Sequence, residues 1–326
     1  MVDRRTFIGG ASGLLVMPLV ARAQQPAIPV IGFLNSRAAG DDPHLLDAFR
    51  QGLKEAGYVE GRNVAIEYRF AGDHGNRLPE LAADLVRRHL AVIVANGPAA
   101  QAAKAATATI PIVFTAGYDP VAVGLVASMS RPGGNITGIS VLDVELGPKR
   151  LELLHAVVPT ATIIAVLVNP SEPARAETIT RNMQAAARNL KLQLQVLHAS
   201  TDRDFDAVFA SLIQGRAGGL VIGGDPFFNS RGAQLGTLTL RYAIPSIYQF
   251  RAFASAGGLA SYGANLTDSY RLTGVYAGRI LHGAKPGDLP IQRATKVELV
   301  INLQTANALG LTIAQSLLVR ADEVIR

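Results

Sequence analysis

Residue types suited to holding a carboxylate stand directly after apolar runs of this sequence. Gly97, Pro98 and Ala99 follow the run "LAVIVAN", and their small side chains leave backbone N–H groups accessible to an anion at the start of a helix. Proline at a helix start is also ordinary capping. Ser36 and Thr115, which end two other runs, can add hydroxyl donors to the same carboxylate, although each is also a common turn residue.

Two aspartates stand where an ammonium group could find its partner. Asp119 in "AGYDPVAVG" and Asp225 in "GGDPFFNS" each precede a proline and a helix, so either can be only an N-cap. A buried ammonium group needs a carboxylate or carbonyl partner. One of the two is our candidate, and Asp225 is favoured because it opens directly from the strand "GLVIGG". Phe227, Tyr248 and Tyr262 can stack on an aromatic or apolar solute, or simply pack in the core.

Amide side chains complete the candidate site, and catalytic patterns are weak. Asn35, Asn169 and Gln249 offer amide groups at strand ends, where Asn is also a frequent turn residue. The chain has no cysteine, which excludes thiolate nucleophiles, thiolate metal sites and disulfides. No two of its six histidines have metal-ligand spacing, and neither a GxSxG elbow nor a Walker loop occurs. We expect no enzyme activity, cofactor or metal.

The elements that must position these residues alternate between strand and helix. Runs such as "IPVIGFLNS" are apolar on both faces, and amphipathic stretches such as "DPHLLDAFRQGLKEAGY" separate them. Strands buried on both faces are typical of parallel sheets covered by helices. The sequence therefore predicts an α/β protein.

An internal repeat indicates two similar lobes. The strand ending at Asn35 matches "IIAVLVNPS", "LVRRHLAVIVANGPAA" matches "LIQGRAGGLVIGGDPFF", and "IPIVFT" matches "IPSIYQ", in order and at nearly constant offset. Such a duplication predicts two doubly wound parallel-sheet lobes. Because ligands of open parallel sheets bind beyond the carboxyl ends of the strands, the candidate residues would form two walls of one cleft.

The end of the chain does not fit a simple duplication. A lone helix follows "GGLASYGANL", and a strand and helix in "KVELVINLQTANALGL" come last. The chain would return to the first lobe near 262–263 and cross back near 286–290, after a first crossing near 138–148. We therefore expect lobe 1 to comprise 24–141 plus 263–285, and lobe 2 to comprise 142–262 plus 286–326. The three connections would form a three-strand hinge.

The chain resembles the periplasmic substrate-binding proteins of ABC transporters with the type I fold, in the branch of tryptophan and aromatic amino-acid binding components. The resemblance is carried by "IPVIGFLNS", "IIAVLVNPSEP", "KVELVINLQTANALGL" and the long stretch "GPAAQAAKAATATIPIVFTAGYDPVAVGLVASMSRPGGNITGIS". It covers nearly the whole chain after residue 23. It implies capture of a small solute, delivery to a membrane permease, and no chemistry.

The first residues read as an export signal. A basic start, a short apolar run broken by glycine and proline, and Ala21-Arg22-Ala23 predict cleavage after Ala23 and a periplasmic protein. Arg4 and Arg5 resemble the twin-arginine pattern, but Asp3 and Gly9 stand where that pattern favours Ser and Lys, so the route stays open. The remaining basic residues are scattered, which argues against nucleic-acid binding.

These observations predict a monomeric receptor for a small solute, most simply an amino acid or a related carboxylate, that docks transiently on ABC permease subunits. The alternative is a secreted α/β enzyme acting on a small metabolite.

Overall fold

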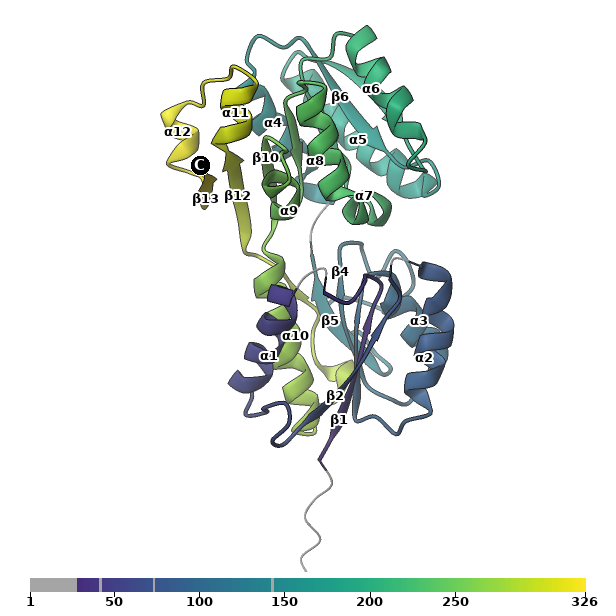
Figure 1. Ribbon diagram of the computed structural model, residues 1–326. Coiled ribbons are helices and arrows are strands. Elements are labelled where there is room, and N and C mark those ends of the chain that lie inside the picture. The colour runs from purple at the N-terminus through teal and green to yellow at the C-terminus, as the bar shows by residue number, and fades with distance from the viewer. Residues whose placement is uncertain (1–27, 41–42, 73, 142–143) are drawn as a thin grey trace, which may run out of the picture.

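The computed structural model describes residues 28–40, 43–72, 74–141 and 144–326. These residues form two α/β lobes, one above the other in Figure 1. Across the described ranges, no helix combines the length and the apolar character needed to cross a membrane. The signal predicted for residues 1–23 lies outside the described residues.

The first lobe is built on a six-stranded sheet in the order β11-β5-β4-β3-β1-β2, and all its neighbouring strands are parallel. Its strands are β1 (Val30–Asn35), β2 (Ala65–Phe70), β3 (Val92–Asn96), β4 (Ile112–Ala116), β5 (Ile136–Ser140) and β11 (Gln292–Arg293). Its helices are α1 (Pro43–Glu55), α2 (Leu78–Val86), α3 (Pro98–Ala106) and α10 (Leu266–Leu281), with short 3-10 turns η1 (Gly75–Arg77) and η3 (Pro286–Asp288).

The second lobe is built on a seven-stranded sheet in the order β13-β12-β10-β9-β8-β6-β7, parallel except for the antiparallel pair β10 and β12. Its strands are β6 (Ile163–Val168), β7 (Gln193–His198), β8 (Leu220–Ile222), β9 (Ser246–Tyr248), β10 (Ala260–Ala264), β12 (Val297–Asn302) and β13 (Glu323–Ile325). Its helical elements are η2 (Val144–Leu146), α4 (Gly147–Val157), α5 (Pro173–Asn189), α6 (Asp204–Gln214), α7 (Pro226–Ser230), α8 (Gly232–Arg241), α9 (Arg251–Ser255), α11 (Leu303–Ala308) and α12 (Gln315–Leu318).

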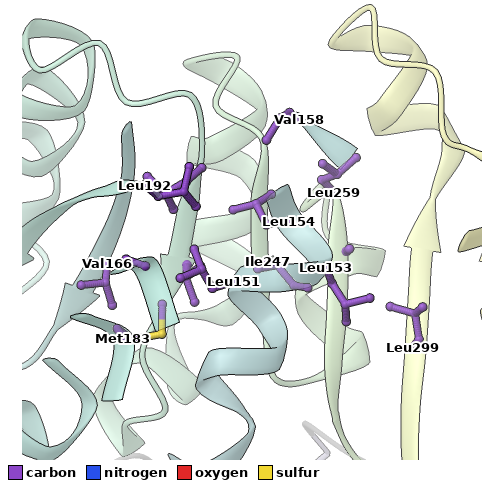
Figure 2. Packing of buried hydrophobic residues seen from close by; sticks show 14 of the residues in the cluster. Leu151, Leu153, Leu154, Val158, Val166, Met183, Leu192, Ile247, Leu259 and Leu299 are labelled. Carbon is purple, nitrogen blue, oxygen red and sulfur yellow. The ribbon is translucent and has the colours of Figure 1, made fainter. Parts of the chain in front are cut away.

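The central strands of each sheet, such as β3, β4, β6 and β8, are buried on both faces, which is why they are apolar without alternation. In β6, Val166 packs with Leu151 of α4 and Met183 of α5, as Figure 2 shows, whereas Leu167 faces the opposite cluster with Phe209 of α6. The first lobe repeats this arrangement, with α1 and α10 on one face of its sheet and α2 and α3 on the other (Figure 1).

The repeat seen in the sequence has a spatial counterpart. The run β5-β4-β3-β1-β2 of the first sheet corresponds in order to β10-β9-β8-β6-β7 of the second. Asn35 ends β1 and Asn169 directly follows the equivalent strand β6, and both are 7% exposed. The predicted α/β class with two parallel-sheet lobes is confirmed.

Three connections join the lobes, from β5 to α4, from β10 to α10 and from β11 to β12. The third lies later than the expected 286–290. Leu289 O accepts a hydrogen bond from Thr137 Oγ1 at 2.7 Å, and β11 pairs with β5, so the chain leaves the first lobe only after Arg293. The Gly/Pro-rich stretch is a turn within the first lobe. The second connection also lies slightly later, because β10 continues to Ala264.

Candidate functional site

A cleft separates the carboxyl ends of the strands of the two lobes. Its cavity volume is about 130 Å³, and both lobes contribute to its walls. The first lobe contributes chiefly Ser36, Asn96, Gly97, Pro98, Thr115, Tyr118 and Tyr270, and the second contributes Arg175, Asn229, Ser230 and Phe250. Ser36, Gly97, Pro98 and Thr115 were candidates from the sequence, and the structure brings them together here.

Asn96 organises the first-lobe wall. Its Oδ1 accepts a hydrogen bond from Ser36 N at 3.0 Å, and its Nδ2 donates to Asn35 Oδ1 at 2.9 Å and to Tyr270 OH at 3.0 Å. Asn35 is buried and also accepts from Arg37 N at 2.9 Å. Asn35 therefore positions cleft residues rather than lining the cleft itself.

The loop that begins α3 is held between two strands. Gly97 has a φ of 47°, in the left-handed region, and its N–H donates to Thr115 O at 2.7 Å. Its carbonyl accepts a hydrogen bond from Tyr118 OH at 2.9 Å. The hydroxyls of Thr115 and Thr273 lie 2.6 Å apart. Ala99 is fully buried in the core of the first lobe, so it supports the loop and does not line the cleft.

Arg175, near the start of α5, is the cation of the second-lobe wall. Its Nε is buried and has no hydrogen-bond partner among the described residues, and its Nη1 makes one long bond, 3.4 Å, to Gly224 O. Burial raises the pKa of Tyr118, on the facing lobe, well above its ordinary value, and the positive charge of Arg175 offsets this only in part. Tyr118 therefore stays a neutral donor beside the guanidinium.

Asp225 lies beneath the second-lobe wall and is 2% exposed. Its Oδ1 caps α7 by accepting from Phe227 N at 2.8 Å, and it also accepts from Asn169 Nδ2 at 3.0 Å. Its Oδ2 is buried without a hydrogen-bond partner in the described part of the chain, as is Oε1 of the neighbouring Gln249. Two buried acceptors thus lack donors at this edge of the second sheet.

Asn229 connects these buried groups to the cleft. Its Oδ1 accepts hydrogen bonds from Tyr248 OH at 2.6 Å and from Gln249 Nε2. Tyr248 and Gln249 are each 1% exposed, so they orient Asn229 from behind. Asn229 lines the cleft, and because its Oδ1 is taken, its amide nitrogen is the group that can donate to a solute.

Three further sequence candidates lie away from this cleft. Phe227 stacks on Phe205 with ring centroids 5.8 Å apart and packs against the core of the second lobe. Tyr262 packs against the other core cluster of that lobe. Asp119 is exposed and its Oδ1 accepts hydrogen bonds within its own turn. It borders a second compartment, which we call the outer groove.

The outer groove adjoins the cleft and is larger, with a cavity volume of about 450 Å³. The first lobe contributes residues 117–120, Ala122, Val123, Met129, Ser140, Val141 and Arg293 to its walls. The second lobe contributes Glu145, Glu172 and one face of α5. Gly117, Tyr118, Val141 and Arg175 line both compartments. The guanidinium therefore stands where the two spaces meet.

The two lobes and the cleft between their strand ends define a binding protein of the type I periplasmic fold. Residues 41–325 match the family model described as ABC transporter substrate binding protein. The chain belongs to this family.

Relatives with known names agree with this class. A tyrosine-binding protein of Clostridioides difficile (strain R20291) is 30% identical over 265 residues, which are 81% of this chain and 75% of the relative. The ABC domain in complex with L-Trp from Streptococcus pneumoniae is 26% identical and superposes with a TM-score of 0.81 over 91% of this chain and 99% of that one. A ligand-free, open substrate-binding protein with adhesive properties from Clostridium difficile, also 26% identical with the same coverage, has a TM-score of 0.71.

Proposed function

We propose that this protein is the solute receptor of an ABC importer, holding an amino acid or a related carboxylate between its lobes. The observation that carries the proposal is the position of Arg175. A guanidinium with a buried, unpartnered Nε lines the cleft opposite Tyr118 and the N-terminus of α3 on the other lobe. A buried donor left without an acceptor costs free energy, so an anion that supplies the acceptor is stabilised there.

The carboxylate is the group we assign to this position. The positive end of α3, a helix of nine residues, lies on one side and the guanidinium on the other. Ser36 lines the same space, and its hydroxyl can donate to a carboxylate oxygen. Thr115 also lines this space, but its hydroxyl donates to Thr273 Oγ1, because the Thr273 hydroxyl itself donates to Ser269 O. Because these donors come from both lobes, a carboxylate favours the closed arrangement over an open one.

Asp225 is the acid we assign to the ammonium group. Asp119 is exposed and its Oδ1 serves its own turn, whereas Asp225 Oδ2 is buried and without a donor in the described chain. Gln249 Oε1 offers a second acceptor from the same edge. A movement of Asn229 would be needed to open these acceptors to the cleft. The Asp225→Ala variant should then weaken an amino acid far more than its deaminated analogue, and equal losses for both would contradict this role.

The names of the relatives favour an aromatic amino acid as the solute. At equal identity and coverage, this chain superposes better on the L-Trp complex than on the ligand-free open protein, which is consistent with lobes near the liganded arrangement. We also propose that the receptor delivers the solute to permease subunits, and its membership of the family supports this. We further propose that the receptor acts as a monomer in the periplasm after cleavage behind Ala23, which N-terminal sequencing of the exported protein checks.

A thermal-shift screen of the exported protein against amino acids, aromatic acids, sugars and ureas tests the proposal. A solute at 100 times its dissociation constant stabilises the folded state by about 2.7 kcal/mol. We expect amino acids, and aromatic ones above all, to give the largest shifts. Shifts from sugars alone would contradict the amino-acid assignment, and turnover without stable binding would favour a secreted enzyme.

A further inference from the structure

The outer groove combines free space with an apolar wall. Its volume of about 450 Å³ lies in the range of about 300–1,000 Å³ typical of small-molecule sites, whereas the inner cleft, at about 130 Å³, lies below that range. Pro120, Ala122, Val123 and Met129 form the apolar part of this wall. Val123 is 46% exposed, so it has apolar surface available to a solute.

Hydrogen bonds hold this apolar wall in place. Asp119 Oδ1 accepts from Val121 N at 2.9 Å and from Ala122 N at 3.2 Å, and Pro120 O accepts from Leu125 N at 2.9 Å. These bonds brace the wall, so little conformational entropy would be lost there on binding. This bracing is a role for Asp119 that needs no contact with the ammonium group.

Arg175 connects the groove to the proposed carboxylate position. On the facing wall, Arg175, Thr178 and Asn182 of α5 are spaced by three and four residues and so share one face of the helix. A solute whose carboxylate is bound by Arg175 has two spaces for its remaining atoms, and only the outer groove is large enough for a bulky side chain.

We propose that the outer groove is the side-chain subsite of this receptor, that it selects a large apolar or aromatic side chain, and that Val123 determines this preference. The inference rests on the proposed function, because it takes the carboxylate to be bound at Arg175. A solute with a small side chain would leave the apolar wall in contact with water and would bind more weakly.

Two valines of one loop provide a matched test. Val121 is 39% exposed and does not line the groove, whereas Val123 does. The isosteric change Val123→Thr places a hydroxyl against the solute and keeps the volume of the side chain, so the two lobes can still close. It should weaken L-tyrosine binding about fivefold. The Val121→Thr variant should keep its affinity within about twofold of the wild type. An equal effect of both changes, or no effect of Val123→Thr, would overturn the subsite.

A second pair of variants fills the groove instead. Ala174 is exposed on α5 and lines the groove, and Ala210 is exposed on α6 away from it. Ala174→Trp should weaken L-tyrosine at least tenfold and L-alanine much less, while Ala210→Trp changes neither. Unchanged L-tyrosine affinity in Ala174→Trp would overturn the inference while leaving the receptor function intact. Absence of binding of every amino acid to the wild type would instead overturn the proposed function, and the subsite with it.

Discussion

Replacing Arg175 by glutamine tests the carboxylate position most severely. The side chain makes no ion pair within the described ranges, and its Nε has no acceptor there, so the loss of folded-state interactions is small. Hydrogen bonds between charged groups contribute about 1.5–3 kcal/mol. One such bond to the solute corresponds to a loss of about 10- to 150-fold in affinity. The Arg175→Lys variant keeps the charge but loses the planar fork of the guanidinium. Its affinity should lie between those of the wild type and Arg175→Gln.

Arg181→Gln is the matched control for this prediction. Arg181 lies on the same helix and its side chain is 67% exposed. Its Nη1 lies 3.8 Å from Glu177 Oε1. Surface ion pairs of this kind contribute little, so its affinity and stability should stay close to those of the wild type. Calorimetric titration with L-tyrosine measures all three variants. If Arg175→Gln binds within twofold of the wild type, the carboxylate is held elsewhere and the reasoning fails.

Three further predictions concern packing, pH and the cleft wall. A Cβ at Gly52 would lie 1.8 Å from Arg271 O, so Gly52→Ala should separate α1 from α10 and destabilise the protein by about 1–3 kcal/mol, while Gly75→Ala, with nothing within 4 Å, should change its thermal unfolding little. Burial raises the pKa of Glu298 above its ordinary 4.5, so its contribution to the free energy of unfolding should fall as pH rises from 4.5 through the raised value. Denaturant titrations across this pH range should show that the free energy of unfolding of Glu298→Gln declines less, or rises more steeply, than that of the wild type. Parallel curves for the two proteins would refute the raised pKa of Glu298. Tyr118→Phe removes the 2.9 Å hydrogen bond to the carbonyl of the α3 loop and should weaken L-tyrosine about fivefold, and a titration showing no change would mean that this bond does not shape the cleft.

The fold was predictable from the sequence because its signals are local and repeated. Apolar runs without alternation predict strands buried on both faces. The ordered matches between the two halves predict two similar lobes, and the two sheets do have corresponding strand orders. The position predicted for the third connection was wrong because proline and glycine indicate a turn but not the lobe in which the turn lies. Only the pairing of β11 with β5 assigns residues 292–293 to the first lobe.

The site was predictable only in part because strand ends fix backbone position and not the exposure of a side chain. Ser36, Gly97 and Thr115 line the cleft as the strand-end argument predicted. Tyr248 and Gln249 occupy equivalent positions but are buried behind Asn229, which lies one helical turn after Asp225 and was missed.

Arg175 was missed for a different reason. It lies beyond the loop after β6, on α5, and no feature of the sequence distinguishes it from the other scattered basic residues. Its proposed role depends on the facing lobe, because Tyr118 lies close enough on the other side of the cleft to feel its charge. A search that continued through the first turn of each helix after a strand would have included both Arg175 and Asn229.

The central claim is that one amino acid is held between the lobes with its carboxylate at Arg175. A crystal structure of the protein with the amino acid that gives the largest thermal shift tests this claim most directly. The account predicts difference density for one solute in the cleft, with the carboxylate against the guanidinium and the start of α3. A solute bound outside the cleft, or bound in it with its carboxylate directed away from Arg175, would contradict the account.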